Sequence, residues 1–161
     1  MKRMSWTTII LFGMAALAAA VFAQGLLKPQ DPGTVISAPE AHEKAAKGEI
    51  VLVDIRTPQE WQQTGIPASA WAITMNQDGR QLVTALEKAM GGDKTKPLAI
   101  ICRTGNRTTH LQGQLKQVGF TNVLNVAEGV AGSRYGKGWL NDGLPLRRGA
   151  DVTKAPVLAA H

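Results

Sequence analysis

The chain has 161 residues, with 18 lysines and arginines against 12 acidic residues, a formal net charge of +6 and one cysteine. That length allows one compact domain with its own core and is too short for two ordinary domains. A single cysteine excludes an intramolecular disulfide. The basic residues are scattered, without a basic helix or an aromatic-interleaved patch, which argues against nucleic-acid binding and suits small anionic ligands.

The N-terminus has the pattern of a secretory signal peptide. Lys2 and Arg3 form a positive start, residues 7–21 are almost wholly apolar and rich in alanine, and residues 21–23 offer a small-residue cleavage pattern. An uncleaved anchor is the alternative, because residues 4–27 carry no charge and are long enough to cross a bilayer. We expect cleavage and export to a bacterial periplasm, with membrane association only if the leader is retained.

Beyond this segment, helix-like and strand-like stretches alternate. Capping boxes at Ser37 and Thr57 mark two helix starts, and short continuous apolar runs are typical of strands covered on both faces. In chain order, we expect a helix ending near Gly48, a strand at 50–53, a short helix carrying Trp61, a strand at 70–74, a helix with an apolar stripe of Leu82, Leu86 and Met90, a strand at 97–101, a helix at 106–118 and a strand at 123–126.

This alternation predicts an α/β fold with a mainly parallel sheet and helices on both faces. We divide the chain into a signal peptide at residues 1–23, a flexible lead-in at 24–33, one folded domain at 34–148 and a loosely ordered tail at 149–161. The tail is assigned on composition, since it shows neither a helical nor a strand period.

The single cysteine lies between a predicted strand and a predicted helix, at the start of the stretch Cys-Arg-Thr-Gly-Asn-Arg. In open parallel sheets, ligands bind just beyond the carboxyl ends of the strands. A turn leading into a helix points N–H groups inward and stabilises an anion. That field, together with Arg103 and Arg107, favours the reactive thiolate form of Cys102. Gly105 suits the left-handed backbone of a tight ring.

The chain resembles the rhodanese-like sulfurtransferases over residues 35–146. The resemblance is carried by Val53-Asp54-Ile55-Arg56 with Glu60-Trp61, by Gly65-Ile66-Pro67, by the loop from Cys102 to Arg107, and by a closing segment of Glu128-Gly129, Trp139 and Gly143-Leu144-Pro145. It implies a five-stranded parallel sheet and a catalytic cysteine that takes a sulfane sulfur atom, holds it as a persulfide and passes it to a nucleophile.

The resemblance makes Cys102 the catalytic residue of a thiosulfate sulfurtransferase-like enzyme. Attack of its thiolate on the outer sulfur of thiosulfate expels sulfite, and guanidinium groups can present paired donors to the oxygens of such an anion. We expect an anionic donor, with thiosulfate favoured over a mercaptopyruvate-like one, and cyanide, an external thiol or a thioredoxin-like protein as acceptor. The expected substrate-binding residues are Arg103, Thr104, Gly105, Asn106 and Arg107.

Four further residues have expected roles. Asp54 and Arg56 follow a strand end, and we expect them to support the active-site side of the fold, as a structural ion pair or in catalysis. Residues 132–138 look like an insertion, whose Arg134 and Lys137 we expect to border the entrance and help select donors; a solvated surface loop is the alternative. One cysteine and scattered histidines provide no metal-ligand spacing, so we predict neither metal nor cofactor.

Two other functions remain open. Phosphatases and arsenate reductases built on this fold resemble rhodaneses but enclose an oxyanion in a seven-position ring, whereas Cys102 to Arg107 spans six positions. Rhodanese-like domains also occur as binding modules, usually without the cysteine. A non-enzymatic sulfur carrier, or a cysteine that only fills the core, is therefore the other alternative.

Overall fold

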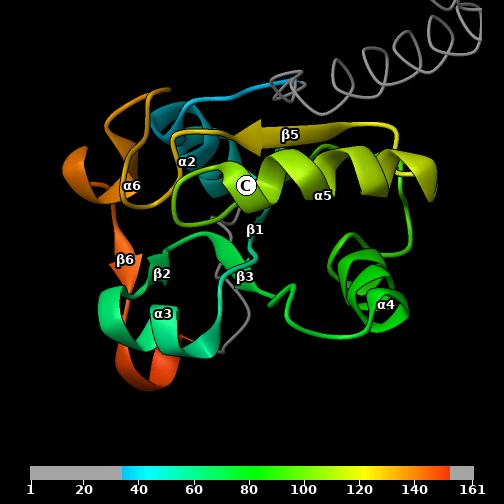
Figure 1. The fold of residues 1–161 in the computed structure, drawn as a ribbon, viewed down its shortest axis with the longest axis horizontal. Helices are drawn as coiled ribbons and strands as arrows, with labels where there is room; N and C mark the ends of the chain where they lie inside the picture. Colours follow the sequence, from blue (N-terminus) through cyan, green and yellow to red (C-terminus); the bar gives the residue numbers. More distant parts are fainter. Residues whose placement is uncertain (1–33, 153–161) are drawn as a thin grey trace, which may run out of the picture. The chain divides into compact units, whose positions relative to one another are not determined.

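A four-stranded parallel sheet, in the order β3-β1-β4-β5, forms the centre of the computed structural model, which describes residues 34–152 (Figure 1). Its strands are β1 (Val51–Asp54), β3 (Ala70–Ala72), β4 (Leu98–Ile101) and β5 (Val123–Val126). Val35 forms a parallel bridge with Asn125 of β5. Within residues 34–152 the predicted parallel sheet is thus confirmed, with four strands where five were expected and a single bridge from Val35 beside β5.

Helices cover both faces of the sheet, as predicted, because neighbouring residues of a strand point to opposite sides. Leu52 and Ile101 face a core that includes residues of α2 and α6, whereas Val53 and Ile100 face a second core built with α4 and α5. The helices are α2 (Ala38–Ala46), α3 (Pro58–Thr64), α4 (Gly79–Ala89), α5 (Asn106–Gln117) and α6 (Gly138–Asn141), followed by the 3₁₀ helix η1 (Gly149–Asp151).

Two of the helix starts follow the predicted capping residues. Ser37 Oγ accepts a hydrogen bond from the N–H of Glu40, at 3.3 Å. At the start of α3 the box is reciprocal: Thr57 Oγ1 accepts from the N–H of Glu60, and the Glu60 carboxylate accepts from the N–H of Thr57 at 3.0 Å. The second box therefore fixes the Glu60 side chain as well as the helix end.

A small antiparallel pair lies beside α3 and was not predicted. Strands β2 (Ile66–Pro67) and β6 (Leu146–Arg147) pair with each other (Figure 1). Ile66 packs with Trp61 and Val152 in a third apolar cluster. The described fold therefore continues through η1 to Val152, four residues past the predicted domain end at 148.

Three predicted segments lie wholly or partly outside the described residues. These are the leader at 1–23, the lead-in at 24–33 and the part of the tail at 153–161. Within residues 34–152, no helix combines the length and apolar character needed to cross a membrane.

Candidate functional site

The Cys102 side chain lies at the carboxyl end of the central strand β4 and is 1% exposed. The N–H of Gly105 donates a hydrogen bond to its sulfur at 3.2 Å, and Thr108 Oγ1 lies 3.8 Å from the same atom. The Gly105 N–H favours negative charge on the sulfur, whereas the Thr108 hydroxyl donates its proton to the Gly105 carbonyl. The strand register pairs Asp54 with Ile101, so the end of β1 lies next to the start of the cysteine loop.

The backbone of Gly105 closes the loop and begins α5. Its φ of 86° is left-handed, and an added Cβ would collide with the carbonyl oxygen of Ala127. The Gly105 carbonyl in turn accepts from the hydroxyls of Thr108 and Thr109, at 2.8 and 2.9 Å. The predicted need for glycine at this position is confirmed by both the angle and the contact.

A second loop, residues 127–131, packs against the cysteine loop. The N–H groups of Val130 and Ala131 donate to the carbonyls of Cys102 and Arg103, each at 2.9 Å. Gly129 has a φ of 70°, and a Cβ there would overlap the Arg103 carbonyl. The second loop therefore holds the backbone of the cysteine loop through two hydrogen bonds and a close contact at Gly129.

Glu128 anchors the second loop and was not identified from the sequence. Its carboxylate is buried and accepts from the N–H of Ala38 at the start of α2 and from the N–H of Gly138, at 2.9 Å for the latter. The only signal in the sequence was a glutamate directly before a glycine in the closing motif. Its partners lie 90 and 10 residues away, so that signal could not reveal the contacts.

Arg107 is held by Glu60 of α3 in a two-pronged ion pair. Arg107 Nη1 and Nη2 donate to Glu60 Oε2 and Oε1 at 2.8 and 2.6 Å. The hydrogen bond from Arg107 lowers the pKa of Glu60 from 4.5 to about 2. The pKa of Arg107 is raised, first by its hydrogen bond to Glu60 and more weakly by Cys102. Sequence reasoning placed Arg107 at the site but missed Glu60 as its partner.

Arg103 is exposed and lines a pocket of about 180 Å³ beside the cysteine loop. Thr104 is half-buried and Asn106 is exposed. Cys102 itself is not among the lining residues, so the pocket adjoins the loop rather than exposing the sulfur. The other residues of the lining are Arg56, Glu60, Gln63, Thr64, Val130, Ala131 and Leu140.

Asp54 and Arg56 form a buried ion pair at this pocket, with Arg56 in its lining. Arg56 Nε and Nη2 donate to the Asp54 carboxylate at 2.7 to 3.0 Å, and Nη2 also donates to the Gly65 carbonyl at 2.7 Å. Arg56 Nη1 donates to Thr64 Oγ1 at 2.8 Å. Burial raises the pKa of Asp54, against the lowering effect of Arg56. The pair ties the end of α3 to β1, which favours the structural interpretation.

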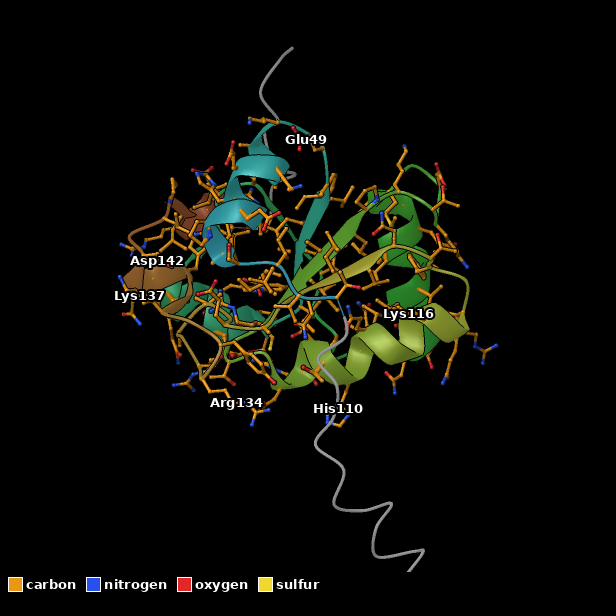
Figure 2. All side chains as sticks on the ribbon, turned by 90° about the horizontal axis from the view of Figure 1, so that it is seen from above. Glu49, His110, Lys116, Arg134, Lys137 and Asp142 are labelled. Carbon is orange, nitrogen blue, oxygen red and sulfur yellow. The ribbon has the colours of Figure 1, made fainter. Side chains whose placement is uncertain are left out.

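The predicted entrance residues lie apart from the pocket lining. Arg134 Nη2 donates to the hydroxyl of Tyr135 at 2.8 Å, and its guanidinium stacks over that ring. Lys137 is exposed, and Figure 2 shows both cations at the periphery of the view, pointing away from the sheet. Neither lines the pocket. A role in donor selection stays a prediction, to be tested by the Michaelis constant of the Arg134→Ala/Lys137→Ala variant.

Possible metal ligands do not gather among residues 34–152: no group of three or more His, Cys, Asp or Glu side chains is placed to bind an ion. Cys102 is a free, buried thiol in this part of the chain. Its sulfur is a possible nucleophile, with the Gly105 N–H as a hydrogen-bond donor to it.

Known proteins are similar to this chain in sequence and fold. The model of the rhodanese-like domain matches residues 37–133. A sulfurtransferase of Allochromatium vinosum is 32% identical over 61% of this chain and 78% of its own, and the thiosulfate sulfurtransferase GlpE of Pseudomonas syringae pv. syringae is 30% identical over 56% and 78%. The polysulfide-sulfur transferase homodimer of Wolinella succinogenes has a TM-score of 0.54 at 25% identity, over 84% of this chain and 90% of that one. The chain belongs to the rhodanese-like domain family and is a sulfurtransferase-type protein.

Proposed function

We propose that this protein transfers a sulfane sulfur atom from thiosulfate, through a persulfide on Cys102, to a thiol or to cyanide. The observation that carries the proposal is the Cys102 sulfur at the carboxyl end of β4, with the Gly105 N–H aimed at it and Arg103 beside the adjoining pocket. A relative named thiosulfate sulfurtransferase supports the choice of donor.

The proposed reaction consists of two displacements at sulfur. The Cys102 thiolate attacks the outer sulfur of thiosulfate, a new S–S bond forms, and the bond inside thiosulfate breaks with its electron pair leaving on sulfite. The acceptor, as a thiolate or cyanide ion, then attacks the outer sulfur of the persulfide and returns the electron pair to Cys102. No external oxidant or reductant is consumed, and no base beside the thiolate is needed.

The loop assists by stabilising negative charge. The N–H of Gly105 points at the Cys102 sulfur, which carries the negative charge before the first displacement and again after the second; in the persulfide between them the outer sulfur carries it. Arg103, exposed at the pocket, is the proposed contact for the sulfite oxygens of the donor. Arg107 is engaged with Glu60, so we assign donor binding chiefly to Arg103 and the loop N–H groups.

The acceptor is proposed to come from outside this chain. Cys102 is the one cysteine in the sequence, so no second thiol of the same chain can resolve the persulfide. A small thiol or a thioredoxin-like protein fits that requirement. With the proposed export of the chain, the reaction would take place in the periplasm.

Intact-mass spectrometry tests the proposal. Purified protein treated with thiosulfate should gain one sulfur, about 32 Da, release sulfite, and lose the added mass to cyanide as thiocyanate. The Cys102→Ser variant should show none of these changes. A sulfur adduct from polysulfide or mercaptopyruvate but not from thiosulfate would refute the donor, and turnover of an aryl phosphate or arsenate without any sulfur adduct would refute sulfur transfer itself.

A further inference from the structure

The charges around the pocket are unevenly paired. Arg56 is neutralised by Asp54, and Arg107 by Glu60. Among the residues described, Arg103 lines the pocket as a guanidinium without a carboxylate partner within ion-pair distance. Of the two arginines that the loop supplies, one therefore offers its full charge to an anion.

The Glu60–Arg107 ion pair is held by several hydrogen bonds and is partly shielded from solvent. Both carboxylate oxygens are engaged by Arg107, and Oε2 also accepts from the N–H of Thr57 at 3.0 Å and lies 3.2 Å from its hydroxyl. The side chains of Glu60 and Arg107 are only 21% and 32% exposed, so solvent screens the pair less than a surface pair. The low pKa of Glu60 keeps its carboxylate charged at any physiological pH.

We propose that Glu60 is a specificity-determining residue that cancels the charge of Arg107 and so limits how strongly the cysteine loop holds doubly charged anions. Without Glu60, the cysteine loop would carry two unpaired guanidiniums, Arg103 and Arg107, which would retain sulfite after transfer and would admit competing dianions such as sulfate and phosphate. With Glu60, the loop presents one net positive charge, enough to orient a sulfur donor without trapping the product. The consequence for thiosulfate turnover rests on the proposed function, whereas the charge balance at Cys102 does not.

The charge balance can be measured without any sulfur donor. Iodoacetate is an anion and iodoacetamide is neutral, but the two have nearly the same size and alkylate the same thiolate. The ratio of the iodoacetate rate constant to the iodoacetamide rate constant at Cys102 therefore reports the local electrostatic potential, independently of how much thiolate is present. Glu60→Gln should raise this ratio roughly threefold or more at low ionic strength, and added salt should reduce the difference. Gln at this position can still cap α3, so the fold should be retained.

Three further variants define the outcome. Arg103→Gln should lower the ratio. Glu87→Gln is the control: it removes a carboxylate of α4 that pairs with Lys94, and it should leave the ratio unchanged. The double variant Glu60→Gln/Arg107→Gln removes both charges, leaves neither unpaired, and should keep the ratio within about twofold of the wild type. A double variant whose ratio falls as far as that of Arg103→Gln would show that Arg107 exerts its charge despite Glu60, and would overturn the proposal.

Steady-state kinetics then separate this proposal from the proposed function. If thiosulfate is the donor, Glu60→Gln should lower its Michaelis constant and make sulfite a stronger inhibitor, while turnover at saturation does not increase. Absence of thiosulfate activity in the wild type would refute the donor and leave the alkylation ratios valid. Unchanged ratios in Glu60→Gln, alongside the expected fall in Arg103→Gln, would refute the role of Glu60 whichever donor is used.

Discussion

Gly105 is the residue at which backbone geometry most directly limits the site. Gly105→Ala would place a methyl group against the Ala127 carbonyl and force a left-handed φ on alanine. We expect a loss of at least about 2 kcal/mol in unfolding free energy and nearly complete loss of sulfur loading. Denaturant unfolding and intact-mass spectrometry measure the two effects.

The matched control for that variant is Gly113→Ala. Gly113 is an exposed position inside α5, and an added Cβ there meets no other atom within 4 Å. Alanine should therefore stabilise the helix by about 0.5 to 1 kcal/mol and leave sulfur loading unchanged. Equal destabilisation by both variants would contradict the role assigned to the Gly105 backbone.

Glu60 should also give the stability of the protein a defined pH dependence. Its pKa is lower in the folded protein than the usual 4.5, so folding favours the ionised form, and the stabilisation is present above that pH. As pH falls through about 4.5 towards 2, the native pair is protonated and the stabilisation is lost. The difference in unfolding free energy between wild type and Glu60→Gln should be constant near neutrality and shrink over this acidic range.

A control at the protein surface separates this effect from general acid sensitivity. Glu43 forms an exposed pair with Lys47, where solvent screening weakens the interaction. The difference in unfolding free energy between wild type and Glu43→Gln should be small at every pH. If the difference in unfolding free energy between wild type and Glu60→Gln is the same at neutral and acidic pH, the ion pair adds nothing to stability.

At the scale of elements, Glu128 adds buried hydrogen bonds between three segments that also pack against one another. It links the start of α2, the second loop and the N–H of Gly138 at the start of α6. Glu128→Ala leaves two buried N–H groups without their acceptor, so we expect unfolding free energy to fall by about 2 kcal/mol or more. Sulfur loading should slow as well, because Val130 and Ala131 of the same loop hold the cysteine loop.

Hydrogen exchange can locate that effect. The amides of Val130 and Ala131 should exchange faster in Glu128→Ala than in the wild type, while those of β4 change less. Glu49→Ala, at an exposed carboxylate labelled in Figure 2, serves as the control with no change expected. If the Val130 and Ala131 amides exchange at the same rate in Glu128→Ala as in the wild type, the second loop is held without this carboxylate.

At the scale of the whole molecule, the predicted signal peptide concerns the cellular compartment in which Cys102 would react. The mature chain recovered from a bacterial periplasm should begin at Gln24, and its mass should correspond to loss of residues 1–23. Fusion of residues 1–30 to an alkaline phosphatase lacking its own leader should yield active phosphatase. Recovery of the uncleaved chain in the membrane fraction would support the anchor alternative instead.

Local patterns in the sequence determined most of the elements. The apolar run at 97–101 and the stripe of Leu82, Leu86 and Met90 predicted β4 and α4, because the period of apolar residues reports the face that is buried. The predicted strand at 123–126 coincides with β5. Strands β2 and β6 escaped prediction, since each has two residues and their pairing spans about 80 positions.

The sequence by itself determined the family, the parallel sheet and the position of Cys102 between a strand and a helix. Those conclusions depend on neighbouring residues and on motifs short enough to recognise. Only the tertiary structure decided that Arg107 is paired with Glu60, 47 residues earlier, while Arg103 at the pocket has no such carboxylate partner among residues 34–152. Two arginines in one loop look equivalent in sequence; which charge remains available depends on the carboxylate that the fold brings beside each of them.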